Sequence, residues 1–65
     1  MANWLKEIES EKEKLSVNDK NKYIFLISNL MSSLLRSDLK SFRNLMIRIA
    51  AVAIHAIEWV EKNES

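Results

Sequence analysis

The segment LKSFRNLMIRIAAVAIHAIEWVEK, residues 39–62, decides the fold. Apolar residues recur in it at alternating intervals of three and four, which is the spacing of one face of an α-helix. Further apolar residues flank this face, so we expect the helix to be covered on several sides. The pattern predicts a helix over residues 38–62. Its predicted oligomer interface consists of Leu39, Phe42, Met46, Ile49, Ala53, Ala56 and Val60.

A second, highly charged helix is predicted near the N-terminus, over residues 3–15. Asn3 stands before its first apolar residue, where an asparagine side chain can accept hydrogen bonds from free backbone amides. Apolar residues are sparse in this segment. We therefore expect it to dock by one edge, mainly through Trp4 and Ile8.

Between these two segments, the sequence predicts a third helix over residues 19–36, with Ser16 or Asn18 as the capping residue. The apolar pattern is then interrupted, and Ser37 or Asp38 is suited to cap the helix that follows. Such a short connection predicts that the second and third helices in chain order form an antiparallel hairpin.

The composition indicates a single all-α domain, residues 1–65, that is stabilised by self-association. The chain has no Gly and no Pro, which favours helices joined by short polar connections. A chain of 65 residues buries only about 60% of its unfolded surface, and the absence of cysteine excludes disulfides. With 48% hydrophobic residues, we expect hairpins to pair into a homo-oligomeric, four-helix-type bundle, either a dimer or a tetramer.

One stripe of the long helix is polar enough to be interpreted as its solvent face. Within it, His55 and Glu58 are three residues apart, a spacing that binds metals in some helical bundles. A metal site would need further inward-facing carboxylates, and no nucleophile has an evident base. We therefore expect no metal, no cofactor and no catalytic residue. The stripe consists of Arg48, Ala51, His55, Glu58 and Lys62.

Basic residues are concentrated in the middle of the chain. Residues 20–48 carry six Lys or Arg against one Asp, whereas residues 1–15 carry three Lys against four Glu. Cations gathered near one end of the hairpin would attract a nucleic-acid backbone, which makes nucleic-acid binding an alternative function. The residues concerned are Lys20, Lys22, Arg36, Lys40 and Arg43.

The sequence predicts a cytoplasmic protein without a membrane span. Residues 45–60 are too few for a span of about 20 residues, and Arg48, His55 and Glu58 interrupt them. The four glutamates of residues 1–15 are unlike a signal peptide. Many Ile, Lys, Asn and Ser residues suggest an AT-rich genome, of archaeal or viral origin.

Residues 26–62, LISNLMSSLLRSDLKSFRNLMIRIAAVAIHAIEWVEK, resemble the MazG-like all-α nucleotide pyrophosphohydrolases. The likeness is most specific in the alanine-rich segment at residues 47–59. In that family, carboxylates on two successive helices bind magnesium. The resemblance implies the same bundle architecture for this chain.

The chain departs from the family at the metal ligands. The resemblance places Ser28, Asn29 and Ser32 where the first helix has glutamates, and Asn44 and Arg48 where the second has acidic residues. Neutral side chains bind Mg²⁺ weakly, and arginine repels it. The resemblance therefore implies a degenerate pocket that has lost the hydrolase chemistry but whose arginine suits a phosphate.

Three functions follow from these observations. The first is a non-enzymatic homo-oligomeric bundle that acts as a binding or scaffold module, with another protein as a possible partner. The second is a small nucleic-acid-binding protein. The third, with the least support, is a nucleotide pyrophosphohydrolase with atypical ligands.

Overall fold

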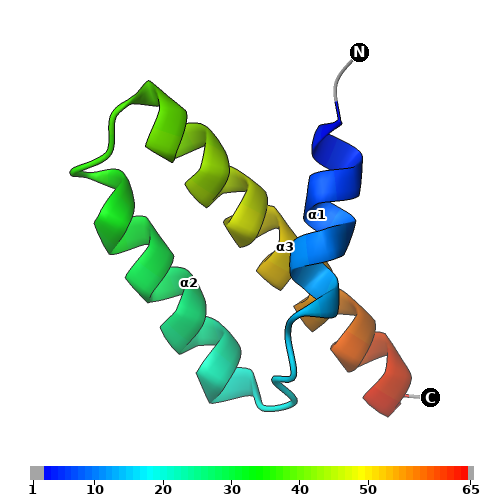
Figure 1. The fold of residues 1–65 in the computed structure, drawn as a ribbon. Helices are drawn as coiled ribbons and strands as arrows, with labels where there is room; N and C mark the ends of the chain where they lie inside the picture. Colours follow the sequence, from blue (N-terminus) through cyan, green and yellow to red (C-terminus); the bar gives the residue numbers. More distant parts are fainter. Residues whose placement is uncertain (1–2, 65) are drawn as a thin grey trace.

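The computed structural model describes residues 3–64, and in this part of the chain it contains three α-helices and no strand (Figure 1). Helix α1 spans Trp4–Glu13, α2 spans Lys20–Leu34 and α3 spans Leu39–Glu64. The prediction of an all-α chain with three helices is confirmed. Helix α3 ends two residues beyond the predicted 62, and α2 ends two residues before the predicted 36.

Aspartates cap α2 and α3. The Lys22 backbone N–H donates to Asp19 Oδ2 over 3.3 Å, and the Ser41 N–H donates to Asp38 Oδ1 over 2.8 Å. The expected cap at Ser16 or Asn18 is wrong, because the helix begins at Lys20 and the residue directly before it takes the capping position. Asn3 does occupy the N-cap position of α1, but its side chain makes no capping hydrogen bond.

Helix α3 is the central element of the molecule. Both α1 and α2 pack against it, whereas the backbones of α1 and α2 do not come together within the described residues. Figure 1 shows α2 beside α3 and α1 crossing α3 at an angle. Two separate clusters of buried side chains result, one under each of the shorter helices.

The smaller cluster joins α1 to α3. It consists of Ile8 from α1 with Ile47 and Ala51 from α3, and Ala50 packs beside it. Ile8 is the one residue of α1 that is buried, which confirms its predicted role, whereas Trp4 remains about half exposed.

The larger cluster joins α2 to α3 and includes the connection between α1 and α2. Tyr23 and Leu30 from α2 are buried against Val52 from α3. Partly buried apolar residues surround these three, including Leu15 and Val17 from the connection. Most of the hydrophobic stabilisation of the chain therefore lies between α2 and α3.

The stripe of α3 interpreted as its solvent face is only partly covered by α1: Arg48, Glu58 and Lys62 are exposed, whereas Ala51 is buried and His55 is partly buried. Ala51 is only 1% exposed, and Lys12 Nζ of α1 lies 3.0 Å from Glu58 Oε2. The small alanine side chain lets Ile8 approach α3 closely, and charged residues around it pair with charges on α1. A polar stripe can thus be covered in part by another polar helix. Among the described residues, no helix is both long and apolar enough to cross a membrane.

Candidate functional site

One face of α3 carries large apolar side chains that remain exposed. Leu39 is 87% exposed, and Phe42, Met46, Ile57 and Val60 are each more than 40% exposed. Exposed apolar residues are common singly, but a contiguous row of them marks an interaction surface. We call these five residues the α3 stripe.

The α3 stripe lies on a side of α3 that neither neighbouring helix fully covers. Helix α1 packs on the side of Ile47 and Ala51, and α2 packs on the side of Val52. In a helix of 3.6 residues per turn, the stripe lies between these two sides. It runs from Leu39 to Val60, a length of about 32 Å at 1.5 Å per residue.

Four of the seven residues predicted as oligomer interface belong to the stripe, namely Leu39, Phe42, Met46 and Val60. Ala53 is partly exposed beside them. The other two, Ile49 and Ala56, pack on the core cluster of α2 within the same chain.

The stripe differs from the predicted row because a strict 3-4 spacing drifts by about 20° per seven residues around a straight α-helix. Ile49 and Ala56, seven and fourteen residues after Phe42, therefore turn progressively toward α2. Sequence reasoning did not place Ile57 on this face. The sequence does contain a signal for this placement, because Ile57 follows Leu39 by eighteen residues, which is five complete helical turns.

The apolar surface continues from the stripe onto both flanking helices. On the α1 side, a hollow of about 470 Å³ is lined by Trp4, Ile8, Phe42, Arg43, Met46, Ile47 and Ala50. On α2, Ile24 and Met31 are exposed on the side turned away from Asn29. Residues of all three helices therefore contribute to one apolar face.

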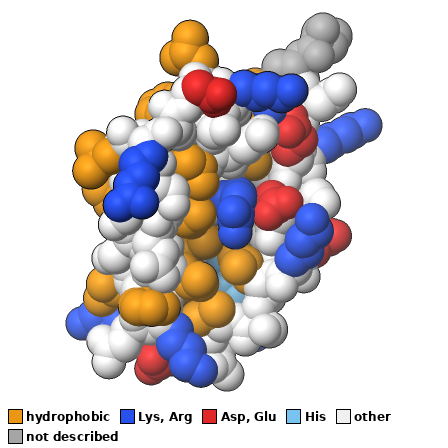
Figure 2. All heavy atoms as spheres, turned by 60° about the vertical axis from the view of Figure 1, so that its left-hand side comes forward, with side chains coloured by type: hydrophobic (Ala, Val, Ile, Leu, Met, Phe, Trp, Pro, Cys, Tyr) orange, Lys and Arg blue, Asp and Glu red, His pale blue; other side chains and the backbone are white. Residues whose placement is uncertain are grey.

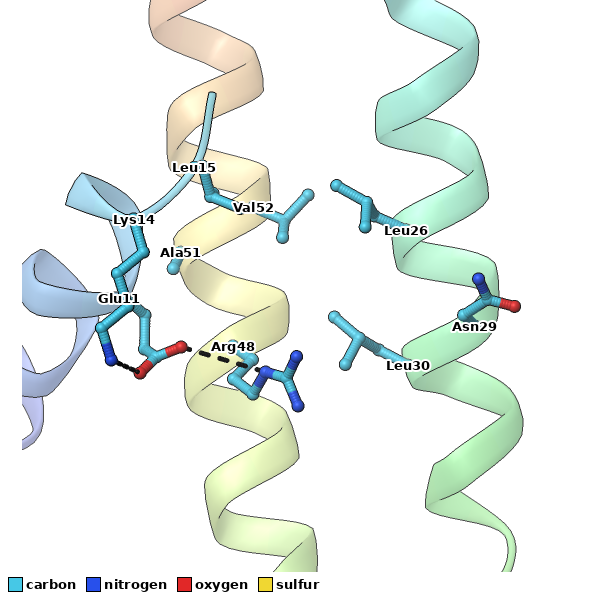
Figure 3. Close-up of a pocket in the computed structure, with 9 residues that line it drawn as sticks. All are labelled: Glu11, Lys14, Leu15, Leu26, Asn29, Leu30, Arg48, Ala51 and Val52. Atoms are coloured by element: carbon cyan, nitrogen blue, oxygen red, sulfur yellow. Dashed lines mark hydrogen bonds and ion pairs between the residues drawn. The ribbon is translucent and has the colours of Figure 1, made fainter. Parts of the chain in front are cut away.

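A different hollow, of about 440 Å³, lies between α1 and α2. Figure 2 shows hydrophobic side chains at its bottom, with Lys, Arg and Glu side chains beside them. Figure 3 shows Leu26 and Leu30 pointing from α2 toward Val52 on α3. Arg48 reaches into the hollow from α3, and its Nε lies 3.9 Å from Glu11 Oε1. Glu11 also pairs with Lys14, so its carboxylate partly offsets the positive charges of both Arg48 and Lys14 at the rim of this hollow.

The five residues of the predicted degenerate pocket do not share one hollow. Asn29 and Arg48 line the hollow between α1 and α2, although the Asn29 amide in Figure 3 points to the other side of α2. Asn44 lines a smaller hollow next to Arg48. Ser32 lies in a shallow depression beside Arg36, and Ser28 is exposed on α2.

The five predicted nucleic-acid residues lie at two ends of the α2–α3 unit. Lys20 and Lys22 are in the first turn of α2, whereas Arg36 and Lys40 are at the connection that follows α2. Arg43 donates two hydrogen bonds, of 3.1 and 2.8 Å, to the two carboxylate oxygens of Glu7. This bidentate bond lowers the pKa of the Glu7 carboxyl and raises the pKa of Arg43.

His55 is partly buried and is held by Tyr23. The Tyr23 hydroxyl donates to the Val17 carbonyl over 2.7 Å, and the same oxygen lies 2.7 Å from His55 Nδ1. A phenol has one hydrogen, so Nδ1 of His55 must donate to Tyr23. Burial raises the pKa of the Tyr23 phenol. In residues 3–64, no three His, Asp or Glu side chains are close enough to form a metal site.

Glu58, the other half of the predicted pair, is bound to α1. Its carboxylate accepts a hydrogen bond from Lys12 Nζ, which raises the pKa of Lys12. His55 and Glu58 thus have separate partners, one on α2 and one on α1.

Comparison with family models, curated proteins and solved structures finds no match to this chain. The resemblance to the MazG-like family therefore rests on residues 26–62 of this sequence alone.

Proposed function

We propose that this chain is a non-enzymatic, homo-oligomeric helical module. A second copy covers the α3 stripe, and the assembled bundle serves as a binding or scaffold module. The single observation that supports this proposal is the row of exposed apolar side chains along α3. Burying apolar surface is the main favourable term in protein association.

The dimensions of the chain suit a dimer. A standard interface buries about 800 Å² on each partner. That is roughly a seventh of the 5310 Å² surface of this chain. The stripe alone is narrow, but the apolar residues of α1 and α2 beside it, among them Trp4, Ile24 and Met31, widen the available surface.

The arrangement we propose is a four-helix-type bundle. In each copy, α2 and α3 form an antiparallel hairpin, and the two hairpins meet through their α3 helices. This is the architecture that the resemblance to MazG-like proteins implies, with Ser28, Asn29 and Ser32 replacing the family's carboxylates. This replacement of carboxylates by neutral side chains supports a role in binding rather than in hydrolysis.

The test is the mass in solution, measured by light scattering over a dilution series. We expect the wild type to be a dimer or tetramer and Phe42→Glu to be a monomer, because it places a charge within the buried interface. Phe25→Glu is the matched control, since Phe25 is 66% exposed and belongs to neither buried cluster. We expect it to leave the mass unchanged.

A wild-type chain that is folded and monomeric at high concentration would contradict the proposal. The α3 stripe would then be assigned to a different protein. Equal effects of Phe42→Glu and Phe25→Glu would show that association does not depend on the stripe.

A further inference from the structure

We propose that the second copy lies antiparallel on α3, with the two helices crossing near Ala50. This inference rests on the proposed function, because it specifies the partner and its orientation at the α3 stripe. Two independent features of α3 support it: the distribution of its charges and the sizes of its exposed side chains.

The two halves of α3 carry opposite charge. Its N-terminal half contains Lys40, Arg43 and Arg48 and no acidic residue. From His55 onward, it contains Glu58, Glu61 and Glu64 against Lys62 alone. Glu7 and Glu11 of α1 pair with Arg43 and Arg48, and Lys12 pairs with Glu58, so these charges are partly offset within the chain. An antiparallel partner still places the basic half of each helix beside the acidic half of the other.

Two of these charges lie on the same side of the stripe. Arg43 and Glu61 are eighteen residues apart, which is five helical turns, and Arg43 also binds Glu7 of α1 within the same chain. Lys40 is exposed at the end of the helix where the partner's acidic half would arrive. A parallel partner would instead bring the two basic halves together and the two acidic halves together, which is unfavourable.

The side-chain sizes agree with the same orientation. Large residues occupy the ends of the stripe, whereas Ala50 and Ala53 are near its middle. In one antiparallel register, Leu39 faces Val60, Phe42 faces Ile57 and Met46 faces Ala53 of the second copy. The large Met46 thereby fills the space above a small residue, and the alanines allow the two backbones to approach.

A parallel pair would be poorly packed. Met46 would meet Met46 and Phe42 would meet Phe42 at one end, while Ala53 facing Ala53 would leave a gap. Large against small is the better packing, because interiors are filled to high density without voids. The orientation is therefore decided by the order of residues along a single helix.

The absence of cysteine from the chain permits a clean crosslinking test. Three single variants are made: Leu39→Cys, Ala50→Cys and Val60→Cys. Circular dichroism checks that each is folded, and light scattering checks that each is dimeric. A disulfide requires Cα atoms within about 7 Å, so each crosslink reports which residues face one another.

For an antiparallel dimer, we expect Ala50→Cys to crosslink with itself upon oxidation. Leu39→Cys and Val60→Cys should each fail to crosslink alone, because like positions are about 30 Å apart in this register. A mixture of these two variants should form crosslinked heterodimers. Spin labels at residue 60 should likewise report a long distance between copies.

The outcomes separate the two proposals. Self-crosslinking of both Leu39→Cys and Val60→Cys would show a parallel dimer, which overturns the orientation and leaves self-association intact. A dimer that crosslinks at none of the three positions would overturn the orientation and the assignment of the stripe. A monomeric wild type would overturn the proposed function itself.

Discussion

The two short helices are attached to α3 by different kinds of interaction. Helix α2 buries Tyr23 and Leu30 in a cluster that also includes Val52 and many partly buried residues. Helix α1 buries Ile8 alone and is otherwise tied by charged pairs on the surface. Exposed ion pairs contribute little to stability, so α2 and α3 should form the stable unit and α1 the detachable part.

The two short helices therefore contribute unequally to the core of this small chain. Three ion pairs set the position of α1 on α3: Glu7–Arg43, Glu11–Arg48 and Lys12–Glu58. They specify how α1 lies, while Ile8 supplies the hydrophobic contact. In the α2 contact, packing supplies both position and free energy.

The largest effect is expected from truncation of the α2–α3 cluster. Leu30→Ala should lower the free energy of unfolding by about 2–5 kcal/mol, because it removes a buried side chain and leaves a cavity. Ile8→Ala should lower the free energy of unfolding by about 1.5–3 kcal/mol at most, because α1 can detach before α2 and α3 unfold. Both values come from urea unfolding at one fixed protein concentration, since association shifts stability.

Leu35→Ala is the control, because Leu35 is 90% exposed and the chemical change is the same as in Leu30→Ala. It should be nearly neutral. If Ile8→Ala destabilised the chain as much as Leu30→Ala, α1 would be an integral part of the core.

An intermediate effect is expected at the hydroxyl of Tyr23. Tyr23→Phe leaves the Val17 carbonyl and the His55 Nδ1–H without their partner, which should cost about 1–3 kcal/mol. The folded pKa of Tyr23 is raised above its ordinary value of 10.0. The resulting stability is fully present below pH 10 and is lost as pH rises through the folded pKa.

Urea unfolding between pH 7 and pH 11 measures this loss. The Tyr23→Phe variant also serves as the control for the alkaline pH range, because it has no phenol to ionise at position 23. An identical decline in stability for the wild type and Tyr23→Phe would show that other groups cause the alkaline effect.

The smallest effect is expected at the surface charges of α1. The pKa of Glu7 is lowered by its hydrogen bonds from Arg43, so this contribution is present above the ordinary value of 4.5. It is lost as pH falls through the lowered folded pKa. On acidification, the hydrogen-exchange protection of the α1 amides should therefore fall, although by less than about tenfold. The protection of the α2 amides should fall by a smaller factor.

Glu7→Gln should already show the weaker protection of α1 at neutral pH and should respond less to acid. High salt should act in the same direction on the wild type, because it screens exposed charges. Protection of α1 that is independent of acid, salt and Glu7 would indicate that packing alone holds this helix.

Much of the fold can be predicted from local patterns. The 3-4 spacing over residues 39–62 predicts the long helix, and the short polar breaks predict the ends of the other two to within a few residues. These features depend on neighbours along the chain, so the sequence contains them directly. The capping residue of α2 was misplaced because a shift of one residue in a helix start changes which side chain can cap it.

The candidate sites were less predictable because they depend on which segments meet. Ser28, Asn29 and Ser32 are neighbours in sequence, yet only Asn29 shares a hollow with Arg48. Lys20 and Arg36 belong to one basic region of the sequence but lie at opposite ends of a helix.

By itself, the sequence determined three helices and the presence of more apolar surface on α3 than two short neighbours can cover. The tertiary structure decided which surface that is. It placed α1 on the polar stripe around Ala51, where charged partners and one small residue allow docking, and it left Leu39, Phe42, Met46, Ile57 and Val60 exposed. The physical reason is that helical periodicity is local, whereas the choice of the face to be covered depends on contacts between residues far apart in the chain.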